Sequence, residues 1–136
     1  MGLTTLLDTS AWVEYLRATG SEVNLAVRSL VGSPGRAIAI TDVVIMELLA
    51  GVRVPEQREK LWSLMNRCLM LPTRPLFDYE VAAELFARCR QVGFTPANTN
   101  DLLVAAVAIG KRVPLLAADT DFVKIASVSS LSLASA

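Results

Sequence analysis

Histidine is absent from this chain of 136 residues. Its absence excludes Ser–His triads, histidine-based acid–base catalysis and nearly all catalytic zinc sites. Cysteine is scarce: Cys68 and Cys89 are the only two, and each lies in an apolar helical pattern without CxxC spacing. We interpret both as free thiols of a protein in a reducing cytoplasm. Any chemistry must therefore come from carboxylates, hydroxyl groups and bound ions.

An excess of charge of either sign is also lacking, because 13 Lys and Arg balance 13 Asp and Glu. A protein that coats nucleic acid through its phosphates would be strongly basic, so a nucleic-acid substrate would have to be held locally. Most of the basic residues are arginines, which suit bidentate phosphate contacts but are equally explained as ordinary surface residues.

Long apolar runs are missing as well, since none reaches the roughly 20 residues that span a bilayer. The N-terminal segment has no basic start and meets a charge at Asp8, so we expect neither a signal peptide nor a membrane partner.

Apolar residues make up 53% of the chain and charged residues 19%, which favours a packed core over disorder. The length predicts a single domain over residues 1–136. Short apolar runs predict strands within residues 4–7, 37–40, 68–72, 114–118 and 131–133. Amphipathic or apolar patterns predict helices near residues 8–17, 21–31, 42–51, 55–69, 79–93, 101–112 and 122–126.

Apolar strands that alternate with helices are typical of a parallel sheet covered on both faces. We therefore predict an α/β fold of three layers, with a mostly parallel central sheet of four to five strands. Ser10, Thr41 and Asp78 are expected to cap helices. The spacing of apolar residues after Pro55 predicts burial of Leu61, Trp62, Met65 and Leu69.

Thirteen carboxylates have to be assigned. Several lie at helical spacing beside basic residues and are explained by a solvated face, and Asp42 is favoured by a helix dipole. Five others are candidates for a site: Asp8, Glu47, Asp101, Asp119 and Asp121. Asp8 and Asp119 each follow a strand, at the edge of the sheet where ligands bind in such folds.

Glu47 is the most unusual of these acids, because it lies within the apolar segment "VVIMELLA". A helix that is apolar on nearly all sides is expected to be buried, and a lone buried carboxylate costs several kcal/mol unless it is paired or bound to an ion. For Asp8, Asp101, Asp119 and Asp121 the alternative interpretation is a helix cap.

Acids gathered at one edge of a sheet would repel one another unless cations neutralise them. Oxygen ligands without His or Cys select a hard ion, Mg²⁺ or Mn²⁺. Such ions clamp phosphate esters and activate water, so the pattern indicates phosphodiester chemistry. Ser10 either orients a ligand carboxylate or simply caps a turn.

Four segments carry a family resemblance: "LLDTSAWVEYL", "VVIMELLAG", "NDLLVAAVA" and "LLAADTDF". In this order and spacing they resemble the PIN-domain ribonuclease toxins of the VapC type over essentially the whole chain. The resemblance implies a Mg²⁺- or Mn²⁺-dependent endoribonuclease that cuts structured RNA, such as tRNA or ribosomal RNA loops. It also implies a homodimer and inhibition by a small VapB-like antitoxin.

By the same resemblance, Asp8, Glu47, Asp101 and Asp119 are metal ligands, Asp121 is an accessory acid and Ser10 supports Asp8. The chain departs from the family pattern in two places. Alanines stand before Asp119, where many members have a polar or basic residue. The polar segment "NTN" reaches up to Asp101, where relatives often show an apolar residue.

The high apolar content predicts a surface buried in a dimer or under an antitoxin, around Trp12, Tyr15 and Leu16 or around Trp62 and Met65. A dehalogenase-type phosphatase would need a second Asp at the position of Ser10, which disfavours that fold. The remaining alternative is an inactive member of the PIN fold that only binds a partner protein.

Overall fold

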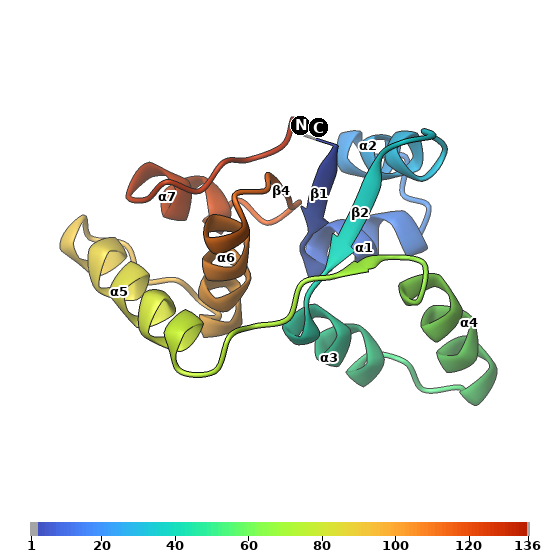
Figure 1. The fold of residues 1–136 in the computed structure, drawn as a ribbon, viewed down its shortest axis with the longest axis horizontal. Helices are drawn as coiled ribbons and strands as arrows, with labels where there is room; N and C mark the ends of the chain where they lie inside the picture. The colour runs from blue at the N-terminus through green and yellow to red at the C-terminus, as the bar shows by residue number, and fades with distance from the viewer. Residues whose placement is uncertain (1–2, 136) are drawn as a thin grey trace.

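A computed structural model describes residues 3–135, so Met1, Gly2 and Ala136, at the ends of the predicted domain, lie outside the described residues. Within this range the chain forms seven helices and four strands (Figure 1). Their order is β1 (Thr4–Leu7), α1 (Thr9–Leu16), α2 (Glu22–Val31), β2 (Ala37–Ile40), α3 (Asp42–Ala50), α4 (Pro55–Met65), β3 (Leu69–Met70), α5 (Phe77–Gln91), α6 (Thr99–Lys111), β4 (Leu115–Leu116) and α7 (Asp121–Ser127).

The four strands form one parallel sheet in the order β3-β2-β1-β4. The predicted α/β class and parallel sheet are confirmed. The weak strand predicted near the C-terminus is reduced to a single parallel bridge between Leu133 and Leu115, beside β4. Two backbone hydrogen bonds hold that bridge, from Leu115 to Ser132 and from Ala134 to Leu115.

The direction of the connections changes at the centre of the sheet. From β1 the chain moves outward through β2 to β3, and it then returns to place β4 on the other side of β1. Because such crossovers are right-handed, the connecting helices cover opposite faces. Helices α5, α6 and α7 accordingly lie together on one side of the strands and α1 and α2 on the other (Figure 1). The carboxyl ends of β1 and β4 therefore meet at the reversal point, where ligands bind in open α/β sheets.

The core lies between the sheet and these helices. Its fully buried side chains include Leu6, Trp12, Ile40, Leu116 and Phe122. The burial predicted along the fourth helix is half right, because Leu61 and Met65 are buried while Trp62 is 41% and Leu69 48% exposed. The reason is that α4 ends at Met65, and Leu69 belongs to the edge strand β3.

Cys89 is buried and Cys68 half-buried, and both thiols are free, as expected. Burial raises the pKa of the Cys68 thiol to about 11, so it stays protonated at neutral pH. Over residues 3–135, none of the helices combines the length and the apolar character needed to cross a bilayer.

Two predicted caps are wrong. The N-cap of α1 is Asp8 rather than Ser10, since the Asp8 carboxylate accepts from the Ser10 backbone N–H. The N-cap of α5 is Leu76, whose φ of 62° is unusual for a leucine. Asp78 instead lies inside the first turn of α5. Thr41 does stand at the N-cap of α3, but its side chain makes no cap hydrogen bond.

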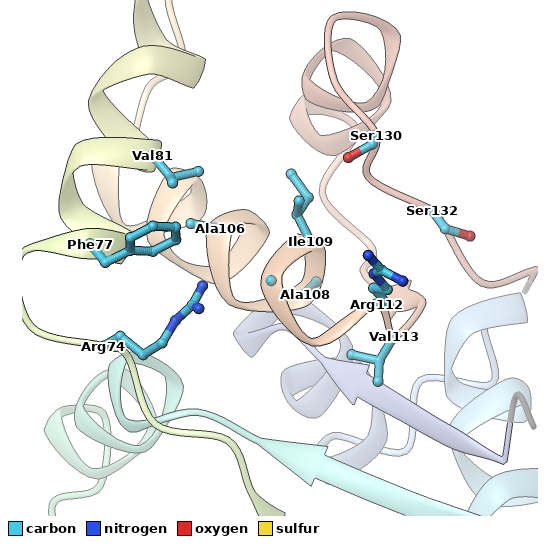
Figure 2. A pocket seen from close by; sticks show the side chains of 11 residues that line it. Arg74, Phe77, Val81, Ala106, Ala108, Ile109, Arg112, Val113, Ser130 and Ser132 are labelled. Carbon is cyan, nitrogen blue, oxygen red and sulfur yellow. The ribbon is translucent and has the colours of Figure 1, made fainter.

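The buried Asp78 carboxylate is paired with Arg74. Its oxygens accept from the Arg74 backbone N–H at 2.7 Å and from the guanidinium at 2.9 Å. Figure 2 shows the Arg74 side chain reaching past Phe77 toward the end of α6, with the guanidinium 4.2 Å from the ring centroid. The backbone of α6 is close at Gly110, where a Cβ would force the Arg74 guanidinium to shift.

Candidate functional site

Asp8 stands at the junction of β1 and α1. Its Oδ2 accepts from the Ser10 backbone N–H at 3.0 Å and from the Ser10 hydroxyl at 2.7 Å. The residue is buried, and Oδ1 has no hydrogen-bond partner among the described residues. A buried carboxylate oxygen without a donor is costly, so this atom is suited to contact a bound cation or water.

Ser10 links Asp8 to the loop after β4. While its hydroxyl donates to Asp8, its oxygen accepts from the backbone N–H groups of Ala118 at 2.9 Å and Asp119 at 3.2 Å. The sequence suggested either support for Asp8 or a simple turn cap. The observed bonds tie the ends of β1 and β4 together.

Three further acids meet across this edge. One carboxylate oxygen from each of Asp101, Asp119 and Asp121 lies within 4.8 Å of the other two. Asp119 accepts from the backbone N–H of Asp121, the first residue of α7, at 2.9 Å. Asp101, in the first turn of α6, is 6% exposed, and its Oδ2 also lacks a partner among residues 3–135. The Asp121 carboxylate therefore lies as close to the cluster as that of Asp119, although the sequence pattern favoured Asp119 as a ligand and Asp121 as an accessory acid.

Electrostatics connect all five acids. Burial, followed by the charges of Asp8, Asp119, Glu47 and Asp121, raises the pKa of Asp101 to about 7. Burial also raises the pKa of Asp8 above its usual range, against the lowering effect of the Ser10 hydrogen bonds, and Glu47 adds to the rise. Acids from four separate segments thus act on one another at one edge of the sheet.

Glu47 reaches this edge from α3, but not as the sequence predicted. It is only half-buried, and its neighbour Met46 is 56% exposed, so the inference of a fully buried helix is wrong. The carboxylate is instead held by neutral donors. Thr9 Oγ1 donates to Oε1 at 2.6 Å, and the side-chain amides of Asn98 and Asn100 donate to Oε2 at 3.3 and 3.5 Å.

Thr9, Asn98 and Asn100 are the site neighbours that sequence reasoning missed. The polar "NTN" segment before Asp101 was visible as a departure from the family pattern, and it is this segment that contacts Glu47. Nothing in the sequence distinguished Thr9 from an ordinary first residue of a helix.

The donor set fits a hard divalent cation. All candidate ligand atoms are oxygens, two of them are buried without a partner, and the carboxylates repel one another. Neither of the two salt bridges found in residues 3–135 involves these five acids. No Lys or Arg of the described chain therefore forms a direct ion pair with these acids.

A cavity of about 690 Å³ lies at the opposite end of α6, and no acid lines it (Figure 2). Its polar lining comes from Arg74, Arg112, Ser130 and Ser132. Those groups do not suit a cation, whereas the acid cluster at the carboxyl edge of the strands does.

Comparison with known families agrees with this geometry. The PIN domain model matches residues 5–128. The chain belongs to the PIN-domain family. Relatives of this PIN protein include a VapC ribonuclease of Mycobacterium bovis and the ribonuclease VapC11 of Mycobacterium tuberculosis. Each is 37% identical to the chain over 130 residues, covering 96% of this chain and 97% of the relative.

Solved structures of the same fold include VapBC and VapC proteins. VapBC2 of Rickettsia felis, solved with a DNA fragment from its promoter, matches with a TM-score of 0.74 and 24% identity over 96% of this chain and 97% of that one. VapC20 of Mycobacterium tuberculosis, described as a toxin that cleaves the sarcin–ricin loop, matches with a TM-score of 0.66 and 20% identity over 94% and 98%. At such identities these structures support the fold alone.

Proposed function

We propose that this PIN-domain protein is a Mg²⁺- or Mn²⁺-dependent endoribonuclease and the toxin of a type II toxin–antitoxin pair. The observation that carries the proposal is the acid cluster, in which buried oxygens of Asp8 and Asp101 lack partners among residues 3–135. The ribonuclease names of the mycobacterial relatives favour RNA as the substrate. Structured RNA, such as a tRNA or a ribosomal RNA loop, is the proposed target.

Asp8, Glu47, Asp101 and Asp119 are the proposed metal ligands, with Asp121 as an accessory acid close enough to share an ion. A divalent cation bound there would neutralise phosphate charge and lower the pKa of an attacking water. Ser10 keeps Asp8 facing the cluster and sets the position of the Asp119 backbone. The Asp121 backbone N–H donates to the Asp119 carboxylate and fixes the start of α7 against the same site.

RNA cleavage in the presence and absence of EDTA tests the proposal. We expect products with 5′-phosphate and 3′-hydroxyl ends, no cleavage in EDTA, and recovery on addition of Mg²⁺ or Mn²⁺. A cyclic phosphate would require attack by the 2′-hydroxyl, which usually relies on histidine, and this chain has none. Cyclic-phosphate ends, or activity that persists in EDTA, contradict the mechanism. An inactive PIN module would show no metal-dependent cleavage at all.

Amide variants assign the acids. Asp8→Asn and Glu47→Gln should abolish cleavage while leaving the melting temperature in EDTA unchanged or higher, because each removes one of several repelling charges. Asp121→Asn should retain measurable activity. Glu14→Gln is the matched control, since Glu14 also accepts from a threonine hydroxyl but lies outside the site. Near-normal cleavage by Glu47→Gln would show that the site is misassigned.

A VapB-like antitoxin is the proposed protein partner, because several of the similar structures are VapBC complexes. A groove of about 690 Å³ between the end of α1 and α4 is a suitable surface. Leu16, Leu61 and Leu64 give it an apolar lining, and Arg17 and Lys60 add positive charge. Leu16→Asp should weaken co-purification with a small protein encoded beside the toxin, and unchanged co-purification would exclude this groove.

A homodimer in the cytoplasm completes the proposal. Of the two predicted apolar surfaces, Trp12 and Met65 are buried in the core and cannot contribute, whereas Leu16 and Trp62 are exposed. Other large apolar side chains, including Met46, Leu76 and Phe77, are also exposed and available for an interface. The free thiols agree with a reducing compartment.

A further inference from the structure

Glu47 differs from the other acids of the site in how it is held. The Asp8 carboxylate is held at the end of its own strand by nearby Ser10. Glu47 lies half-exposed in the second turn of α3, and its three donors come from segments 38 to 53 residues away in the chain. We propose that Thr9, Asn98 and Asn100 are positioning residues that hold the Glu47 carboxylate in place for a cation.

A glutamate in this position needs such support. Its side chain has three rotatable bonds, and fixing them costs conformational entropy. The charges of Asp8 and Asp101 act on the same region as that of Glu47, because both feel its charge. Without donors, repulsion would favour rotamers that carry the carboxylate away from the site into solvent.

Thr9 makes the shortest of the three contacts. It is the first residue of α1 and directly follows Asp8, and its hydroxyl lies 2.6 Å from Glu47 Oε1. The bond therefore fastens Glu47 to the backbone that carries Asp8. Two ligands from separate elements are held in register by a single hydroxyl group.

Asn98 uses both ends of its amide. Its Oδ1 caps α6 by accepting from the Asn100 backbone N–H at 3.0 Å, while its Nδ2 donates to Glu47 Oε2 at 3.3 Å. Asn100 Nδ2 reaches the same oxygen at 3.5 Å. The start of the helix that carries Asp101 is thereby joined to Glu47, so the three donors connect α1, α3 and α6 around the site.

The chemistry of the donors matters as much as their positions. A lysine or arginine in their place would pair with Glu47 and compete with a cation for its charge. Hydroxyl and amide groups orient the carboxylate but leave its charge available. Partners of this kind typically change metal affinity by 10- to 100-fold when they are removed.

The inference rests on the proposed metal site, and a Mn²⁺ titration followed by electron paramagnetic resonance tests it with a readout independent of RNA cleavage. Thr9→Val keeps the shape of the side chain but removes the hydroxyl. It should weaken Mn²⁺ binding by roughly tenfold or more and lower kcat for RNA with little change in KM. Thr9→Ser should restore most of the affinity. Thr19→Val is the matched control, because it removes a threonine–glutamate hydrogen bond of 2.9 Å outside the site.

Coupling to Glu47 separates positioning from a general structural effect. In a Glu47→Gln background, Thr9→Val should cause no further loss of Mn²⁺ affinity, because the group through which Thr9 acts is already neutral. Asn98→Ser keeps a capping hydroxyl but cannot reach Glu47, so it should weaken Mn²⁺ binding without lowering the melting temperature in EDTA. If Thr9→Val does not fold, the Mn²⁺ affinity of Asn98→Ser still tests whether the donors to Glu47 have a positioning role.

Equal Mn²⁺ affinity in the wild type, Thr9→Val and Asn98→Ser overturns the inference and leaves the proposed function intact. The same follows if Thr9→Val weakens binding equally with and without Glu47. A wild-type protein that neither binds Mn²⁺ nor cleaves RNA overturns the proposed function, and the positioning role falls with it.

Discussion

The Asp101 side chain, 6% exposed, feels the charges of four other acids, and its pKa rises to about 7. In the unfolded chain the same group titrates near 3.8. The folded, metal-free protein therefore binds this proton more tightly than the unfolded chain does. Once the Asp101 carboxylate is ionised, it lowers the free energy of unfolding, and bound cations would restore that free energy.

A pH-dependent stability follows. Between about pH 4 and pH 7 the folded state holds more protons at Asp101 than the unfolded state does. The free energy of unfolding of the metal-free protein is therefore higher at low pH and falls as the pH rises toward 7. In metal-free buffer, Asp101→Asn should raise the melting temperature more at pH 8 than at pH 5. Melting curves of both proteins at the two pH values measure this difference. An equal effect at both would show that Asp101 is ionised throughout.

For individual residues, the sequence identified the acids of the site but not the side chains that surround them. Glu47 was singled out because of its apolar neighbours, yet the structure leaves it half-exposed and Met46 on the surface. An apolar pattern shows that a helix is hydrophobic, but it does not show which faces of that helix other elements of the fold cover. The contacts of Glu47 with Thr9 and Asn98 join residues 38 and 51 positions apart, which depends on the tertiary arrangement.

Among the elements, the order of strands and helices was predictable because each gives a local signal. Gly51 ends α3 and Pro55 opens α4, as their usual positions at helix ends suggest. The start of α5 was not predictable. The chain enters α5 through Leu76, which has a positive φ. Asp78 was expected to be the N-cap, but its carboxylate accepts a hydrogen bond from Arg74 instead.

Gly110 gives an element-scale test of this arrangement. Gly110→Ala should displace the Arg74 guanidinium and weaken its pair with the buried Asp78, because the new Cβ would overlap a guanidinium nitrogen. Loss of that bond to a buried carboxylate should cost about 1–3 kcal/mol of unfolding free energy. Urea unfolding measures the change.

Gly32→Ala is the control for that experiment. Gly32 is the C-cap of α2, whereas Gly110 lies in the last turn of α6. The φ of Gly32 is −86°, and a Cβ there would meet only ordinary contacts, the nearest at 3.5 Å. Its stability should stay within about 0.5 kcal/mol of the wild type, or rise slightly as the unfolded chain loses freedom. Equal effects of the two substitutions would mean that Arg74 adapts without losing Asp78.

Across the whole molecule, topology explains why a chain with no net charge has a strongly acidic edge. The connections reverse between β1 and β4, so the segments that follow these two strands meet. Asp8 directly follows β1, and Asp119 follows β4 after two alanines. Helices α3 and α6 bring Glu47 and Asp101 to the same edge. The gathering of these acids at one edge could be predicted from the sequence, because ligands bind at the carboxyl ends of parallel strands. That Asp121 lies as close to the cluster as Asp119 could be learned only from the folded geometry.

An anomalous difference map from crystals grown with Mn²⁺ tests the central claim most directly, because it locates the ion without relying on activity. The account predicts a peak at the carboxyl edge of β1 and β4, roughly 2.0–2.3 Å from carboxylate oxygens of Asp8 and Asp101, with Glu47 and Asp119 or Asp121 completing the site. A map with no peak there, while Asp8 and Asp101 stay buried and unpartnered, would contradict the assignment of this cluster as a metal site.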